Sequence, residues 1–119
     1  MSCFFDIAGE TVWNPSLSAG KLFASAVGNL AQLYGLDSGI VDDSSDTYEI
    51  DREVFLSFAE RIFDRYFATS HPEYRLLLRG VLVMSLALLE RGGVILRATT
   101  AEQAELLGEV HERSVRLPV

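Results

Sequence analysis

The sequence predicts a mainly α-helical α+β fold, in which about four helices pack around a central apolar helix beside a small N-terminal β-hairpin. Residues 76–89 are fourteen consecutive residues with one charge, Arg79, and one hydroxyl, Ser85. A helix that is apolar on every side must be covered on every side, so we expect other helices to surround it. Other segments of the chain carry apolar residues at helical spacing or helix-capping residues.

Length and composition indicate one globular domain over residues 1–119. Leu, Ile, Val and Phe make up 39 of the 119 residues, a larger share than disordered chains contain. The apolar run is too short to cross a bilayer, which takes about 20 residues. Residues 1–10 lack the basic and apolar parts of a secretory signal. We therefore expect a cytoplasmic protein that binds no membrane.

The first segment, CFFDIAGETVW, predicts the hairpin. Residues 4–7 and 11–13 are rich in β-branched and aromatic side chains, and a glycine-containing bend separates them. A lone hairpin is marginally stable in water, so we expect this one to lie on the helices.

A first helix is predicted from Pro15 to Tyr34, because Asn14 can cap it and proline suits the first helical position. Gly35 is a natural stop. Apolar side chains recur along it at spacings of three and four, which places them on one face. This stripe consists of Phe23, Val27, Leu30 and Tyr34 and is widened by Leu22, Ala26 and Leu33.

Residues 37–51 are predicted to be a polar connector with a short extended piece near residues 48–50. Asp51 then caps a second helix over residues 52–68, which is the clearest amphipathic helix of the chain. Pro72 opens a third helix that contains the apolar run and ends near Arg91.

The last part of the chain predicts a short strand and a fourth helix. Residues 94–96 are apolar and β-branched, which favours a strand that joins the hairpin. Thr100 and Gln103 have the spacing of a capping box at the start of the last helix.

The formal net charge of −7 opposes binding to nucleic acid and favours a basic protein partner. Residues 37–53 contain seven carboxylates and a single basic residue, Arg52. A solvated loop beside a helix N-terminus explains the same run, so both interpretations stay open. The residues predicted to contact a basic partner are Asp42, Asp43, Asp46 and Glu49.

A calcium-binding loop fits this acidic run poorly. Thr47 stands where the sharp turn of an EF-hand needs glycine, and Glu49 stands where an apolar residue is usual. We therefore predict no metal site and no cofactor. The oxygen-bearing residues at EF-hand spacing are Asp42, Ser44, Asp46 and Glu53.

A second candidate site lies at the N-terminal bend, where carboxylates stand near an indole and could line a small-molecule pocket. A tryptophan in this position more often packs a hairpin onto a helix, and we favour that interpretation. The residues of the candidate pocket are Asp6, Glu10, Trp13 and Asn14.

No catalytic residue is predicted, because no phosphate-binding or nucleophile motif is present. Cys3 is the only cysteine, and without a nearby base its thiol acts as a small apolar group. His71 and His111 lack the neighbouring ligands of a zinc site. Arg79 lies in a segment that should be dry, so it must reach the rim or pair with an acid.

The stretches CFFDIAGETVWNPS and TYEIDREVF resemble a family of short uncharacterised proteins from filamentous Gram-positive bacteria. The resemblance implies a bacterial origin. The family has no assigned activity, so the resemblance assigns no functional residue.

We expect a small acidic, non-enzymatic protein-binding module of the kind that neutralises a toxin or regulates a partner. One alternative is a small-molecule-binding protein or accessory enzyme with a pocket near the hairpin. The other is a structural homodimer that associates through the apolar helix around Val83, Met84 and Ala87.

Overall fold

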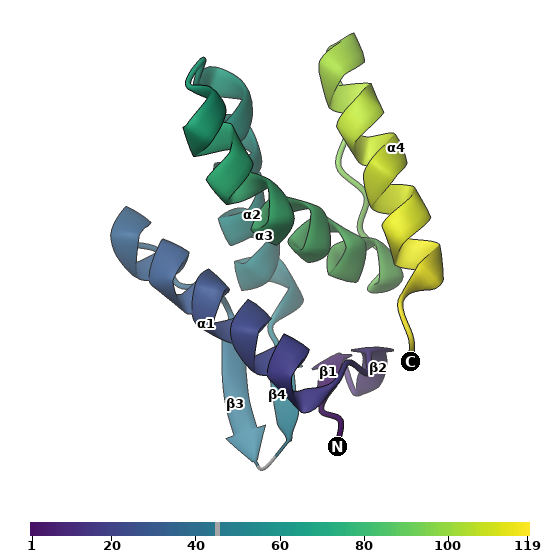
Figure 1. Ribbon diagram of the computed structural model, residues 1–119. Coiled ribbons are helices and arrows are strands. Elements are labelled where there is room, and N and C mark those ends of the chain that lie inside the picture. Colours follow the sequence, from purple (N-terminus) through teal and green to yellow (C-terminus); the bar gives the residue numbers. More distant parts are fainter. Residues whose placement is uncertain (45) are drawn as a thin grey trace. The chain divides into compact units, whose positions relative to one another are not determined.

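The computed structural model describes residues 1–44 and 46–119, and these group into two compact units. The sheet unit comprises residues 1–58 and 117–119, and the helical unit comprises residues 59–116. Figure 1 shows the α+β character that the sequence predicts. The expectation of one domain over residues 1–119 stays a prediction.

The sheet unit contains a four-stranded sheet, and the predicted hairpin is one half of it. Its strand order is β2-β1-β4-β3. Neighbouring strands run antiparallel in the pairs β1–β2 and β3–β4 and parallel in the pair β1–β4. The strands are β1 (Phe4–Ile7), β2 (Glu10–Trp13), β3 (Ile40–Ser44) and β4 (Thr47–Ile50).

The second hairpin corrects the prediction of a polar connector over residues 37–51. Only the extended piece near residues 48–50 was expected, and it lies in β4. Ile40 and Val41 are β-branched and begin β3, where Ile40 is the register partner of Ile50. The strand was hard to predict because Asp42 and Asp43 follow, and aspartate is rare in strands. Ser45, inside the predicted connector, lies outside the described residues.

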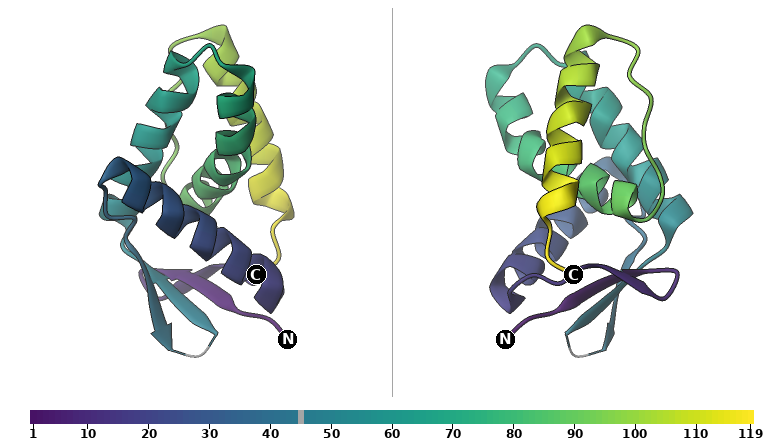
Figure 2. Two further views of the ribbon diagram at one scale, coloured as in Figure 1. Left: turned by 60° about the vertical axis from the view of Figure 1, so that its left-hand side comes forward. Right: turned by 90° about the vertical axis from the view of Figure 1, so that its right-hand side faces the viewer.

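Helix α1 (Leu17–Tyr34) covers one face of this sheet, as both views in Figure 2 show. The ring of Phe23 meets the rings of Phe5 and Trp13 edge to face, at centroid distances of 5.8 and 5.7 Å. The helix begins two residues later than predicted, because Ser16 is its cap and accepts a hydrogen bond from the N–H of Ala19 at 3.2 Å. Gly35 ends α1 in the left-handed conformation, as expected.

Leu22 and Leu33 do not widen the buried stripe of α1, contrary to the prediction. Both are exposed. Each precedes a residue of the predicted stripe by one position, which is about 100° around the helix. The buried residues of α1 are Gly20, Phe23, Val27 and Ala31.

Helix α2 (Arg52–Ala68) begins in the sheet unit and continues into the helical unit, which also contains α3 (Pro72–Arg91) and α4 (Ala101–Arg116). The predicted N-terminal caps of α2 and α4 are confirmed. The carboxylate of Asp51 accepts the N–H of Val54 at 3.2 Å. The hydroxyl of Thr100 accepts the N–H of Gln103 at 3.1 Å.

The prediction that the apolar run is buried on every side is wrong for the first turns of the run. Leu76 is 73% exposed and Leu77 is 80% exposed. In the first half of α3 only Leu78 of the run is buried, whereas the second half is buried at Leu82, Val83 and every residue from Ser85 to Leu89. An apolar side chain is not obliged to be inside, so composition alone could not separate the two halves. Val83 and Ala87 belong to the buried half and Met84 is half-buried, and the homodimer through this helix stays a prediction.

No strand forms at residues 94–96, which corrects another prediction. The N–H of Val94 donates to the carbonyl of Leu89 at 2.8 Å and so closes the end of α3. Ile95 is exposed. Val94 therefore belongs to the helix terminus, although the local composition of residues 94–96 favours a strand.

Candidate functional site

The four residues predicted to contact a partner lie on the hairpin β3–β4. Asp42 and Asp43 are exposed on β3, and Glu49 is half-buried on β4. Asp46 has a positive φ of 69°, a conformation that aspartate tolerates better than most residues. Its carbonyl accepts the N–H of Phe4 at 2.8 Å, which ties this end of the hairpin to β1.

The sheet brings together residues from the two candidate sites. Asp6 on β1 is the register partner of Glu49 on β4 and of Thr11 on β2. Glu49 in turn is the register partner of Val41 on β3. These four residues form one row across the sheet, and the hydroxyl of Thr11 donates to the Asp6 carboxylate at 2.8 Å.

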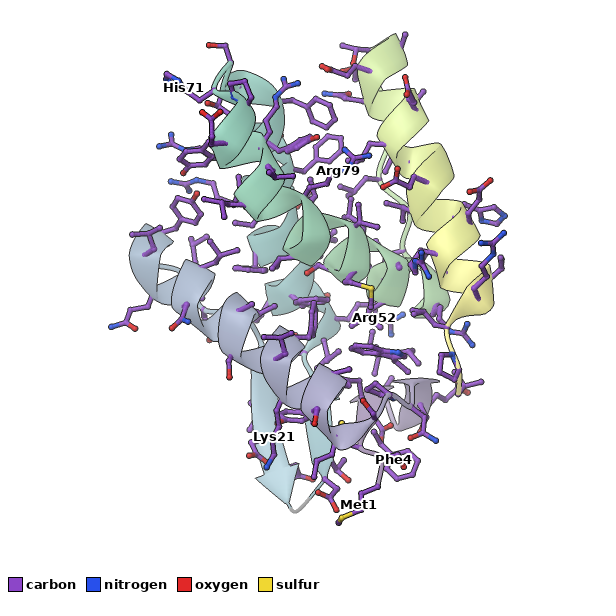
Figure 3. The ribbon with its side chains drawn as sticks, in the orientation of Figure 1. Met1, Phe4, Lys21, Arg52, His71 and Arg79 are labelled. Atoms are coloured by element: carbon purple, nitrogen blue, oxygen red, sulfur yellow. The ribbon has the colours of Figure 1, made fainter. Side chains whose placement is uncertain are left out.

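This row belongs to the sheet face opposite α1, which we call the open face. Side chains alternate along a strand, so Phe5 and Trp13 point to the covered face and their neighbours point away. None of the open-face residues is buried. One of them, Phe4, can be found by its label in Figure 3. The open face consists of Phe4, Asp6, Thr11, Val41, Thr47 and Glu49.

Two exposed apolar side chains on the open face were not expected from the sequence. Phe4 is 40% exposed and Val41 is 59% exposed. The signal for Val41 was present, because a β-branched pair followed by a short polar stretch and TYEI is typical of a second hairpin. The open face therefore combines carboxylates with exposed apolar side chains.

The residues of the candidate pocket separate between the two faces. Trp13 is buried on the covered face and stacks on Phe5 at 5.1 Å, so it packs the hairpin onto the helix as favoured above. Asn14 donates its backbone N–H to the carbonyl of Pro118 at 2.8 Å. Glu10 is exposed at the start of β2. The pocket itself stays a prediction.

Cys3 is buried beneath α1. Its sulfur lies 3.8 Å from the carbonyl oxygen of Ser16. Burial raises the pKa of this thiol, the charge of Asp46 raises it further, and Lys21 lowers it. The thiol therefore stays protonated at neutral pH, in agreement with its interpretation as a small apolar group.

The net negative charge of the molecule lies entirely in the sheet unit. That unit contains nine acidic and two basic residues, Lys21 and Arg52, which give a net charge of −7. The helical unit contains eight acidic and eight basic residues, which give a net charge of zero. The two counts together reproduce the charge of the whole chain.

Two Arg–Glu ion pairs join α3 to α4 in the helical unit. Arg79 reaches from α3 toward α4 (Figure 3), where it pairs with Glu109 at 2.8 Å and donates to the hydroxyl of Tyr66 at 2.7 Å. Arg75 pairs with Glu102 at 2.9 Å. The prediction that Arg79 reaches the rim or pairs with an acid is confirmed, since it pairs with Glu109 and its side chain is 39% exposed.

Two open hollows lie in the helical unit. One, of about 340 Å³, is at the connection of α2 and α3 beside His71. The other, of about 140 Å³, lies between α2 and α4 beside Arg79 and Glu105. Neither is lined by a residue of the two candidate sites. In the part of the chain that the structure describes, no three His, Cys, Asp or Glu side chains come together as metal ligands.

Comparison with known proteins gives a family and no activity. The model of a family of unknown function, DUF6086, matches residues 1–119. No curated protein matches the chain, and no solved structure matches it. Within residues 1–44 and 46–119, no helix has both the length and the apolarity of a membrane span.

Proposed function

Because the chain belongs over its full length to the DUF6086 family of unknown function, we propose a function from its own surface. The protein is a small acidic module that binds a basic protein partner through the hairpin β3–β4 and the open face. Its role is the neutralisation or regulation of that partner rather than catalysis. On the resemblance noted above, we further propose that the protein is bacterial and that it works in the cytoplasm.

The observation that carries this proposal is the confinement of the net charge of −7 to the sheet unit. A field concentrated on one unit steers a basic partner to that unit and speeds association. The apolar side chains of Phe4 and Val41 lie on the same sheet face as Asp6 and Glu49. Binding would bury them while the carboxylates meet the basic groups of the partner.

The register of Asp6 and Glu49 supports the same surface. Their carboxylates belong to neighbouring strands of one face and add to the same local negative field. A cationic side chain placed beside both would be attracted by both. The arrangement therefore supports a cationic group as the ligand of this face.

The test compares two variants that each remove four negative charges and so have the same net charge of −3. The patch variant is Asp42→Asn, Asp43→Asn, Asp46→Asn and Glu49→Gln. The control variant removes four exposed carboxylates of the helical unit that lie outside the ion pairs of Arg75 and Arg79. Its substitutions are Glu60→Gln, Asp64→Asn, Glu73→Gln and Glu112→Gln.

The measurement is the association rate of each variant with the purified protein that copurifies with the chain from its host. The patch variant should associate about tenfold more slowly at low salt, with a flatter dependence on ionic strength. The control variant should stay close to the wild-type protein. Equal slowing by both variants, or a copurifying partner that is acidic, would sink the proposal.

A further inference from the structure

Strand β3 is an outer edge of the sheet. Among residues 1–44 and 46–119 its one partner strand is β4, and Figure 1 shows it at one end of the sheet. The opposite end is different, because Asn14, directly after β2, donates its N–H to Pro118 near the C-terminus. In the described chain, no strand or terminal segment pairs with the outer side of β3.

The backbone of Asp42 faces this outer side. The carbonyl of Gly39 accepts the N–H of Asp51 at 2.8 Å, so residue 39 faces β4. The N–H of Ile40 instead donates to the Ser38 hydroxyl at 3.2 Å, so residue 40 faces outward. Backbone groups alternate along an antiparallel strand, which turns Val41 toward β4 and Asp42 outward.

The side chains of β3 select what can pair there. A second copy of this chain would bring the same aspartates against Asp42 and Asp43, and like charges on adjacent strands repel. A basic segment is attracted instead. Val41 and Asp42 point to opposite faces of the sheet, so a matching strand alternates apolar and basic side chains.

We propose that an extended basic segment of the partner adds a fifth strand to the sheet along β3. Its main chain hydrogen-bonds to the backbone of Asp42, its basic side chains lie beside the Asp42 carboxylate, and its apolar side chains lie beside Val41. Strand addition of this kind obtains affinity from main-chain bonds and specificity from alternate side chains. The inference rests on the proposed function and names the form of the partner.

The probe is a short capped peptide of alternating lysine and valine, added to the full-length protein labelled with nitrogen-15. Hydrogen exchange at the outward amide of Asp42 should slow about fivefold or more when the peptide is bound, as expected for one new backbone hydrogen bond. The amide of Val41, which faces β4, is the internal control and should change less. Unchanged exchange at Asp42 with bound peptide overturns the inference.

Two matched comparisons separate main-chain pairing from charge. A peptide with N-methylated lysines keeps its charge and cannot donate those main-chain bonds, so it should bind about tenfold more weakly. Asp42→Pro and Asp42→Asn remove the same charge, but only proline also removes the outward N–H, which edge strands tolerate. Asp42→Pro should therefore bind the unmodified peptide more weakly than Asp42→Asn.

The outcomes distinguish the two proposals. If the N-methylated peptide binds as well as the unmodified one while the patch variant loses binding, the acidic surface is the docking site and strand addition is wrong. If the patch variant binds the unmodified peptide as well as the wild-type protein does, the acidic docking surface fails too.

Discussion

Gly20 on α1 lies directly against Cys3, the residue before β1. A β-carbon added at Gly20 would overlap the sulfur of Cys3 and would also approach the ring of Phe5 at 3.2 Å. Glycine in a helix interior costs about 0.5–1 kcal/mol relative to alanine. Gly20 lets α1 lie close to the sheet, since any larger residue would meet the sulfur of Cys3.

This contact makes a double-mutant prediction. Gly20→Ala alone should destabilise the protein by about 1–3 kcal/mol, because the added methyl group overpacks the interface. Cys3→Ala removes the clashing sulfur, so Gly20→Ala should cost clearly less in the Cys3→Ala background. Urea unfolding of the two single variants and the double variant measures the coupling. Gly28→Ala is the control, since nothing lies within 4 Å of a β-carbon there, and purely additive effects would contradict the prediction.

At the scale of elements, α3 has two different halves in one apolar run. Leu78, Leu82 and Leu86 recur every four residues and are buried, and they form the inner stripe of the helix. Leu76 and Leu77 lie outside this stripe and face solvent. The first half is therefore an ordinary amphipathic helix whose outer face carries leucines, and only the second half is a core helix.

A leucine pair tests this division of α3. Leu82→Ala should cost about 2–5 kcal/mol, since it opens a cavity at a fully buried position. Leu77→Ala should change stability by no more than about 0.5 kcal/mol, because the side chain already faces water. The free energy of unfolding from urea titrations measures both. Equal losses at the two positions would show that Leu77 is covered.

At the scale of the whole molecule, the two units differ in net charge. The sheet unit carries the net charge of −7, while the helical unit is neutral. Self-repulsion destabilises a compact unit of one charge sign. Ion pairs such as Arg79–Glu109 give the helical unit attraction at short range instead.

Salt should therefore affect the two units differently. Raising sodium chloride from about 20 to 300 mM shortens the screening length to below about 8 Å and weakens repulsion within the sheet unit. Amide exchange in the sheet should slow, while exchange in α3 and α4 should change little. Hydrogen exchange followed by NMR measures this unit by unit. The patch variant is the control, because exchange in its sheet should respond less to salt. Equal slowing of exchange in both units of the wild-type protein would contradict the explanation.

Local chemistry determined the helix boundaries that the sequence predicted correctly. Asp51 and Pro72 act within a few residues of their own positions, and the starts of α2 and α3 follow from them. Arg79 was also predictable, because a guanidinium in an apolar segment needs a polar partner wherever the chain folds. The acidic residues of the candidate surface were likewise visible in the sequence.

The tertiary structure decided which of these residues meet. Asp6 and Glu49 stand more than forty positions apart in the chain, and only the parallel pairing of β1 with β4 makes them neighbours. Strand pairing depends on distant partners, so residues 40–44 form a strand despite their aspartates and residues 94–96 form none despite their apolar side chains. Burial depends on distant partners too, and for that reason the leucine-rich run alone could not show that Leu76 and Leu77 face solvent while Leu82 does not.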